Sequence, residues 1–127
     1  MKSSVVSILD ENDLEFVDLL VKQGLKQNTA KTLTLLKGVP AATAKDLEIG
    51  ADMRQPEVSV AIRELKQYEW IHETEQNRQG KGRPYKIYTL KVDVATIVEE
   101  LEEKKRLESK ETLENIMRLK ELSKSQK

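Results

Sequence analysis

The chain has 127 residues, enough for one domain with a single modest core. Hydrophobic residues make up 38% and charged residues 35%, a balance that favours a small helical domain with a long solvated helix over a thick layered fold. No apolar run reaches the roughly 20 residues of a membrane span, and residues 1–13 lack the apolar core of a signal peptide. With no cysteine and a single histidine, we expect no disulfide, no metal site, no cofactor and a cytoplasmic location.

Opposite charges gather in different parts of the chain, although the formal net charge is zero. Segment 9–19 has acidic residues and no basic one. Segment 76–91 has no acidic residue, and its basic residues are Arg78, Lys81, Arg83, Lys86 and Lys91. A compact group of cations is typical of a surface that binds phosphate, so the zero total does not argue against a nucleic-acid partner.

Two amphipathic helices are predicted in the first third of the chain. The first begins near Asp10, with Asp10 or Asn12 as its N-cap, and stops at Gly24. The side chains expected on its core-facing stripe are Leu14, Val17, Leu20 and Val21. The second helix covers about residues 27–37, and its expected inner face consists of Ala30, Leu33 and Leu36.

A helix-turn-helix is predicted from Thr43 onward. Thr43 can cap a third helix because Asp46 follows three residues later, as in a capping box, and this helix ends near Gly50. A fourth helix begins at Gln55, where Pro56 suits the first turn, and runs to about residue 68. Its apolar stripe has helical spacing and consists of Val58, Ala61, Ile62 and Leu65.

The opposite face of the fourth helix carries groups that a helix in the DNA major groove would use. Gln55 could read adenine, and Val60 could contact a thymine methyl group. Arg54 or Arg63 could bind a guanine or a phosphate. Glu57 could accept from a cytosine amino group, or could exclude other bases by repulsion. The alternative is an ordinary amphipathic helix with a solvated face.

A β-hairpin with a basic tip is predicted next, from strands at about 70–74 and 85–90. Its tip, residues 75–84, contains Gly80 and Gly82, which free the backbone to turn. The cations of this segment could contact phosphates or enter the minor groove, as the wing of a winged helix does. The alternative is a flexible charged hairpin without a ligand.

Residues 23–90 resemble an archaeal-type winged-helix transcriptional regulator of the TrmB and MarR/ArsR-like group. The segment QGLKQNTAKTLTLLKGVPAATAKDLE resembles the opening of TrmB-type domains, RQPEVSVAIRELKQYEWI their recognition helix, and GKGRPYKIYTL their wing. Two positions depart from the family pattern: Glu69 stands where a glycine usually ends the recognition helix, and Arg54 where a serine or threonine commonly caps it. The sugar-binding domain of large TrmB proteins is not in this sequence.

The resemblance implies sequence-specific binding of double-stranded DNA as a homodimer, with positions 54–63 in the groove and 78–86 on the backbone. It covers roughly half of the chain. The residues that we expect to contact DNA are Thr43, Arg54, Gln55, Pro56, Glu57, Ser59, Val60, Arg63, Arg78, Lys81, Arg83 and Lys86.

No catalytic arrangement is predicted. The sequence has no nucleophile–base pattern and no glycine-rich nucleotide motif, and His72 has no group of potential metal ligands near it. Trp70, Tyr68 and Tyr88 could form a stacking platform for single-stranded nucleic acid, but packing between helix and hairpin explains them more simply. We therefore expect a protein that is not an enzyme.

A long C-terminal helix is predicted after Asp93, without a helix breaker before Ser123. Its apolar residues form two patches separated by the charged run EEKKRLESKE, so a steady heptad of a parallel coiled coil is absent. An antiparallel or crossed helix pair in a homodimer explains two patches; the alternative is a solvated tail. The expected dimer contacts are Val94, Ile97, Val98, Leu101, Leu113, Ile116, Met117 and Leu119.

These patterns together predict a mainly α fold with a small β-hairpin. A winged helix-turn-helix at 1–92, with a recognition helix at about 55–68 and a wing at about 76–86, would precede a dimerisation helix at 93–127. The function that we expect is regulation of transcription through double-stranded DNA. The alternative is a winged-helix module that binds other proteins of a transcription-related assembly. The sequence identifies no small-molecule effector.

Overall fold

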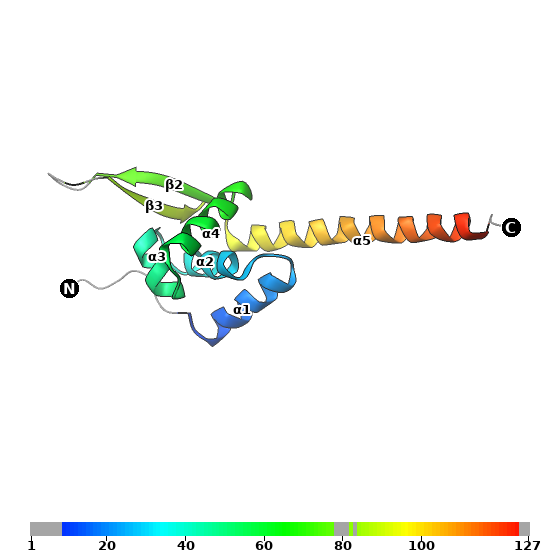
Figure 1. Cartoon of the computed structure of the whole chain (residues 1–127), viewed down its shortest axis with the longest axis horizontal. Helices are drawn as coiled ribbons and strands as arrows, with labels where there is room; N and C mark the ends of the chain where they lie inside the picture. The colour runs from blue at the N-terminus through cyan, green and yellow to red at the C-terminus, as the bar shows by residue number, and fades with distance from the viewer. Residues whose placement is uncertain (1–8, 78–81, 83, 125–127) are drawn as a thin grey trace. The chain divides into compact units, whose positions relative to one another are not determined.

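The computed structural model describes residues 9–77, 82 and 84–124, which form two compact units divided after Asp93 (Figure 1). The first unit contains four helices and a small sheet. Its elements in chain order are α1 (Glu11–Lys22), α2 (Gln27–Lys37), β1 (Ala42–Thr43), α3 (Ala44–Ala51), α4 (Gln55–Gln67), β2 (Ile71–Gln76) and β3 (Tyr85–Leu90). The second unit is one helix, α5 (Val94–Lys124).

Helix α2 lies at the centre of the first unit, where it contacts α1, α3, α4 and β3. The predicted inner residues Ala30, Leu33 and Leu36 are almost fully buried. The structure also buries threonines of α2 that the apolar pattern did not predict. The Thr32 hydroxyl donates to the Asn28 carbonyl at 2.9 Å and the Thr34 hydroxyl to the Ala30 carbonyl at 2.7 Å, so these hydroxyls are satisfied inside their own helix.

Helix α1 packs against α2 through fewer residues than its sequence predicted. Val17 and Leu20 are buried, but Leu14 is 53% and Val21 is 36% exposed, so the expectation that all of them face the core was wrong. The reason is geometric: among the described elements α1 packs mainly against α2, and a single helix–helix contact covers a narrow stripe.

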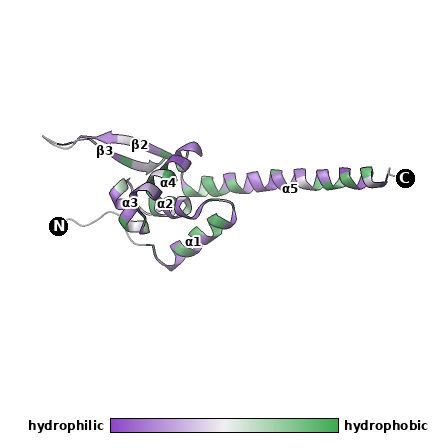
Figure 2. Cartoon of the chain, in the orientation of Figure 1, coloured by the Kyte–Doolittle hydropathy of each residue, from purple (hydrophilic) through white to green (hydrophobic). Residues whose placement is uncertain are grey.

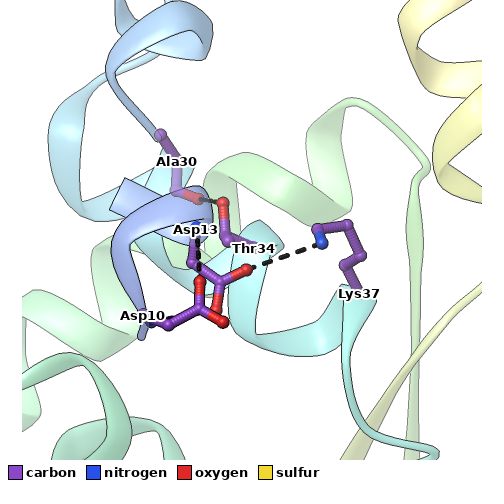
Figure 3. Close-up of polar contacts among 5 residues, drawn as sticks. All are labelled: Asp10, Asp13, Ala30, Thr34 and Lys37. Atoms are coloured by element: carbon purple, nitrogen blue, oxygen red, sulfur yellow. Dashed lines mark hydrogen bonds and ion pairs between the residues drawn. The ribbon is translucent and has the colours of Figure 1, made fainter. Parts of the chain in front are cut away.

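Polar contacts fix the start of α1 beside the end of α2 (Figure 3). Asp10 and Asp13 form a capping box, in which the Asp13 N–H donates to Asp10 Oδ1 at 2.8 Å and the Asp10 N–H to Asp13 Oδ2 at 3.1 Å. The second carboxylate oxygen of Asp13 lies 3.6 Å from Lys37 Nζ. One aspartate therefore caps its own helix and joins it to α2.

The sheet has three antiparallel strands in the order β1-β3-β2, one strand more than the predicted hairpin. In β1, Ala42 pairs with Tyr88 and Thr43 with Ile87. A strand of two residues is too short to show alternation in a sequence, and its partner lies far along the chain. The predicted hairpin is confirmed as β2 and β3, with β2 extending to Gln76.

The end of α4 is held in a strained backbone conformation. Glu69 follows the helix with φ of 64°, the left-handed region in which glycine is most readily accommodated. The Glu69 N–H donates to the Lys66 carbonyl at 2.9 Å and the Trp70 N–H to the Leu65 carbonyl at 3.2 Å, so the helix closes as a glycine would close it. Glu69 therefore differs from the glycine of the family pattern in residue type, but its backbone has the conformation that a glycine would adopt.

The start of α2 is stabilised by a side chain of α4. No side chain of α2 itself caps its N-terminus. Instead the Glu64 carboxylate lies 2.7 Å from Lys26 Nζ and accepts a hydrogen bond from the Thr29 hydroxyl. These hydrogen bonds, from Lys26 first, lower the pKa of Glu64. An anion at a helix N-terminus also interacts favourably with the helix dipole, so this contact joins α4 to the central helix.

Helix α5 has 31 residues and would measure about 46 Å at 1.5 Å per residue. Ile97 is the buried side chain among its described residues. Figure 2 shows hydrophobic colour toward both of its ends. The exposed large apolar side chains on it are Val98, Leu107, Leu113, Ile116, Met117, Leu119 and Leu122. Within the described ranges, no helix has the combination of length and apolar character needed to span a membrane.

Replacing Glu69 with glycine should stabilise the protein. Glycine removes the steric cost of a positive φ, so Glu69→Gly is expected to raise the free energy of unfolding by about 1 kcal/mol and to raise Tm in thermal denaturation. Glu69→Ala is the matched control, because it also removes the 4.0 Å pair with Lys91 but keeps the strain. Equal Tm values for the two variants would contradict this explanation.

The contacts of Glu64 should make the free energy of unfolding depend on pH in the acidic range. Because its folded pKa lies below its unfolded value, its contribution is present near neutral pH and is lost as pH falls through the folded pKa. Glu64→Gln should therefore cost about 1 kcal/mol at pH 7 and flatten the loss of stability below about pH 5, measured by urea unfolding at several pH values.

A second variant separates this contact from general charge effects. In a chain that carries Lys26→Met, the first cause of the Glu64 shift is gone, so Glu64→Gln should change the acid dependence less. An unchanged effect in that background would show that Lys26 is not the partner that matters.

Candidate nucleic-acid interface

The start of α3 is fixed by a reciprocal pair of hydrogen bonds. The Asp46 N–H donates to Thr43 Oγ1 at 3.1 Å, and the Thr43 N–H donates to Asp46 Oδ2 at 3.0 Å. The predicted capping box is therefore confirmed. Thr43 also belongs to β1, so the strand pairing and the cap together place the first helix of the helix-turn-helix.

A short turn then orients α4. Asp52 ends α3 with φ of 55°, and the Met53 N–H donates to the Glu48 carbonyl at 2.9 Å. Met53 is buried and anchors the turn. Two residues later α4 begins with Gln55, and Pro56 lies in its first turn, where its missing N–H leaves no hydrogen bond unmade.

Glu57 has a structural partner at the N-terminus of α4. Its Oε1 accepts a hydrogen bond from the Arg54 N–H at 2.8 Å, so a side chain three residues into the helix satisfies the N-cap backbone. Arginine at the cap position is therefore accommodated, because Glu57 makes the capping contact with the backbone of Arg54. This hydrogen bond fixes Glu57 Oε1 at the N-terminus of α4.

The two faces of α4 differ as its sequence predicted. Val58, Ala61, Ile62 and Leu65 are buried. The outer face is exposed, with Val60 at 39% exposure, and its other exposed members are Arg54, Gln55, Pro56, Glu57, Ser59 and Arg63. One face of the helix is thus fixed in the core while the predicted base-reading side chains are brought together in solvent.

A groove of about 500 Å³ runs between α4 and the sheet. Gln55, Ser59 and Arg63 line it from α4, together with Lys66. Lys86 of β3 and Glu73 of β2 line it from the sheet. The exposed residues of the helix and a cation of the predicted wing therefore share one surface, as a DNA backbone beside a recognition helix would require.

Glu73 forms ion pairs with two lysines inside this groove. Its Oε1 lies 3.0 Å from Lys66 Nζ, and its Oε2 lies 3.4 Å from Lys86 Nζ. The hydrogen bond from Lys66 lowers the pKa of Glu73 most, and the Lys86 hydrogen bond adds to it, while partial burial opposes them. Sequence reasoning missed Lys66 and Glu73, because the pair joins two elements whose approach no local pattern reports.

A second hollow of about 830 Å³ lies beside the start of α3. Thr43, Lys45 and Lys86 are among its lining residues, with Asn77, Pro84 and Tyr85 on the hairpin side. Lys45 is an exposed cation in the first turn of α3, and it was not among the predicted contacts. Its place beside Lys86 extends the basic surface from α4 to α3.

The predicted contacts Arg78, Lys81 and Arg83 lie outside the described residues. Of the basic residues in the predicted wing, Lys86 is the one that the structure places, exposed on β3. The described part of the interface thus comprises α3, α4 and the paired portion of the hairpin.

Two aromatic residues beside the interface, Trp70 and Tyr88, are buried in the core, whereas Tyr68 is 40% exposed. The rings of Tyr68 and Trp70 are stacked, with centroids 4.1 Å apart and planes 7° apart. Trp70 is 3% exposed and Tyr88 7% exposed, so neither presents a face to a base. The interpretation of Trp70 and a tyrosine as core residues at the junction of helix and hairpin is confirmed. Over residues 9–77, 82 and 84–124, no cluster of histidine, aspartate or glutamate is arranged to hold a metal ion.

No protein-family model matches the sequence, and no curated protein matches it either. Several solved structures are similar to this chain. TrmBL2, described as an archaeal chromatin protein with a novel mode of DNA binding, aligns at 20% identity and a TM-score of 0.66, over 86% of this chain and 40% of its own. The chain therefore spans about two fifths of the length of TrmBL2.

Two further solved structures align over most of this chain and most of their own length. A protein described as a transcriptional regulator aligns at 15% identity and a TM-score of 0.53, over 91% of this chain and 78% of its own. NadR, solved in complex with 4-hydroxyphenylacetate, aligns at 18% identity and a TM-score of 0.51, over 86% and 79%. Together with the order of elements described above, these similarities establish the architecture: the chain has a winged helix-turn-helix fold followed by a long C-terminal helix.

Proposed function

We propose that this protein is a transcriptional regulator that binds double-stranded DNA as a homodimer. The observation that carries the proposal is the exposed polar face of α4 beside a groove lined by Arg63, Lys66 and Lys86. An α-helix fits the major groove of DNA, and cations beside it can neutralise phosphates. The fold shared with TrmBL2, itself described by its mode of DNA binding, supports the same function.

Within this proposal the interface divides into reading and anchoring parts. Gln55, Ser59 and Val60 on α4 contact base edges, and Arg54 and Arg63 bind a guanine or a phosphate. Thr43 at the start of α3, together with Lys86 and the wing cations Arg78, Lys81 and Arg83, contacts the backbone. Glu57 keeps its hydrogen bond from the Arg54 N–H, and its negative charge repels bases that present a hydrogen-bond acceptor to it. Two copies would place their recognition helices in successive major grooves about 34 Å apart.

The second part of the proposal is that α5 pairs with α5 of another copy in antiparallel orientation. Val98 and Ile116 are separated by 18 residues, as are Leu101 and Leu119, which corresponds to whole turns of helix. Both pairs therefore lie on one side of α5. In an antiparallel arrangement of two α5 helices centred near Glu108, Val98 of each copy lies opposite Leu119 of the other, and Leu101 lies opposite Ile116.

Charges in the middle of α5 favour that orientation over a parallel one. Lys105 and Glu108 lie between the apolar pairs, close to the same side of the helix. A parallel pair in register would place each of them opposite its own copy, so like charges would repel. In the antiparallel pair, Lys105 lies opposite Thr112, so the repulsion between the two copies of Lys105 is absent.

DNA binding should depend strongly on salt and on the wing. Replacing Lys81 and Arg83 with alanine should weaken binding to any duplex by about 10- to 100-fold near 0.1 M salt, because each lost phosphate contact removes about 0.9 from the slope of log K against log salt. A mobility-shift titration at several salt concentrations measures both quantities. Unchanged affinity would show that the wing does not contact DNA.

Gln55→Ala serves as the contrasting variant. It should alter the preferred sequence found by selection from random duplexes, while leaving the salt slope near that of the parent protein. If the parent protein shifts no random duplex at micromolar concentration and low salt, the DNA-binding proposal falls. The alternative then is a module that binds other proteins of a transcription-related assembly.

The dimer should be broken by a charge on the apolar side of α5. Ile116→Glu is expected to halve the mass measured by light scattering, because it buries a carboxylate between the helices. Leu107→Glu is the matched control, since Leu107 lies nine residues earlier and so projects from the opposite side. A monomeric parent protein, or equal effects of both variants, would contradict the proposed pairing.

A further inference from the structure

The groove beside α4 contains an acidic residue among the cations that would bind DNA. Lys66 and Lys86, from α4 and β3, both reach the carboxylate of Glu73 on β2. The side chain of Glu73 is 22% exposed, whereas those of Lys66 and Lys86 are 48% and 52% exposed. The carboxylate therefore lies deeper than the ammonium groups, which remain accessible to a ligand in the groove.

A carboxylate and a phosphate oxygen are interchangeable partners for a lysine. Both are anionic acceptors, and an ammonium group has only three N–H donors to distribute among them. A phosphate approaching Lys66 or Lys86 also approaches Glu73, so it meets a negative charge behind each cation. In addition, the lowered pKa of Glu73 keeps the carboxylate ionised at neutral pH.

We propose that Glu73 competes with DNA phosphates for Lys66 and Lys86, and thereby lowers the affinity of the protein for duplex of any sequence. This inference rests on the proposed DNA binding and adds Lys66 to its phosphate contacts. The side chains of α4 that face the bases are unchanged by it, so Glu73 acts on the sequence-independent part of binding. Glu73 is a positioning residue that acts through Lys66 and Lys86. It holds both ammonium groups and leaves fewer of their N–H donors for DNA phosphates.

The test uses the full chain and random-sequence duplex. Glu73→Gln keeps the shape of the side chain and removes its charge. It should bind about 3- to 10-fold more tightly near 0.1 M salt, and its slope of log K against log salt should be steeper by about 0.9 for each additional phosphate that the freed lysines neutralise. Glu15→Gln is the control, because it makes the same change in net charge at an exposed position of α1 and should alter binding less than twofold.

A second variant tests whether the effect passes through the lysine. Lys66→Gln should weaken binding by the parent protein by a smaller factor than it weakens binding by the Glu73→Gln protein, since Glu73 partly occupies this cation in the parent. In the Glu73→Gln background the same change should remove most of the increase in affinity and in salt slope. A purely structural role of Glu73 would shift the unfolding midpoint but would not produce this dependence on Lys66.

Two results would overturn the proposal. The first is a Glu73→Gln protein that unfolds at the same midpoint and binds equally or more weakly. The second is an equal factor of weakening by Lys66→Gln in the parent protein and in a chain that carries Glu73→Gln or, where that chain fails to fold, Glu73→Ala. If the parent protein binds duplex and either result is found, only the role of Glu73 falls. If neither the parent protein nor Glu73→Gln binds, the proposed DNA binding falls with it.

Discussion

Burial of most of α2 is the constraint on which the rest of the fold depends. Helices α1, α3 and α4 and strand β3 all contact it, so their relative positions are set by one element. The buried part of such a helix needs apolar or hydrogen-bonded side chains, and Thr32 and Thr34 meet that need by donating to carbonyls of their own helix. At its N-terminus, the side chains of Lys26 and Thr29 contact the carboxylate of Glu64, which belongs to α4. The surface that faces DNA in our proposal is therefore built directly on the core.

Local signals in the sequence predicted most of this fold. The bounds of α2, the capping box of α3 and the two faces of α4 depend on neighbouring residues, and the structure confirms each of them. The predictions failed where distant elements decide the outcome. Strand β1 exists only because β3 pairs with it, and Leu14 is exposed because one neighbour, not two, covers α1. The exposed face of α4 could be predicted from helix periodicity, whereas the cluster of Lys66, Glu73 and Lys86 required three elements to be placed.

The electrostatics of the chain show why a net charge of zero is a poor guide to partners. Acidic residues lie on α1 and serve as caps, as in Asp10 and Asp13, or lie in ion pairs. Exposed cations on α3, α4 and β3 line two hollows beside these elements. Ligand binding responds to this local field, since charges farther away than about 10 Å are screened at 0.1 M salt. In our proposal, the balance of charges inside the groove, not the net charge of the chain, decides how strongly a DNA phosphate is bound.

The short pairing of β1 with β3 has a consequence for how the hairpin can vary in length. Two residue pairs, Ala42 with Tyr88 and Thr43 with Ile87, fix the register of β3. Lys86 and Tyr88 are two residues apart in β3 and line the same groove, because side chains alternate between the faces of a strand. One residue inserted between Lys86 and Ile87 would move Lys86 to the opposite face, away from Glu73 and the groove. Residues added between Gln76 and Tyr85 leave that register untouched. Length changes in this hairpin are therefore tolerable at its tip and not in its strands, so the reach of the wing can change while the groove keeps its shape.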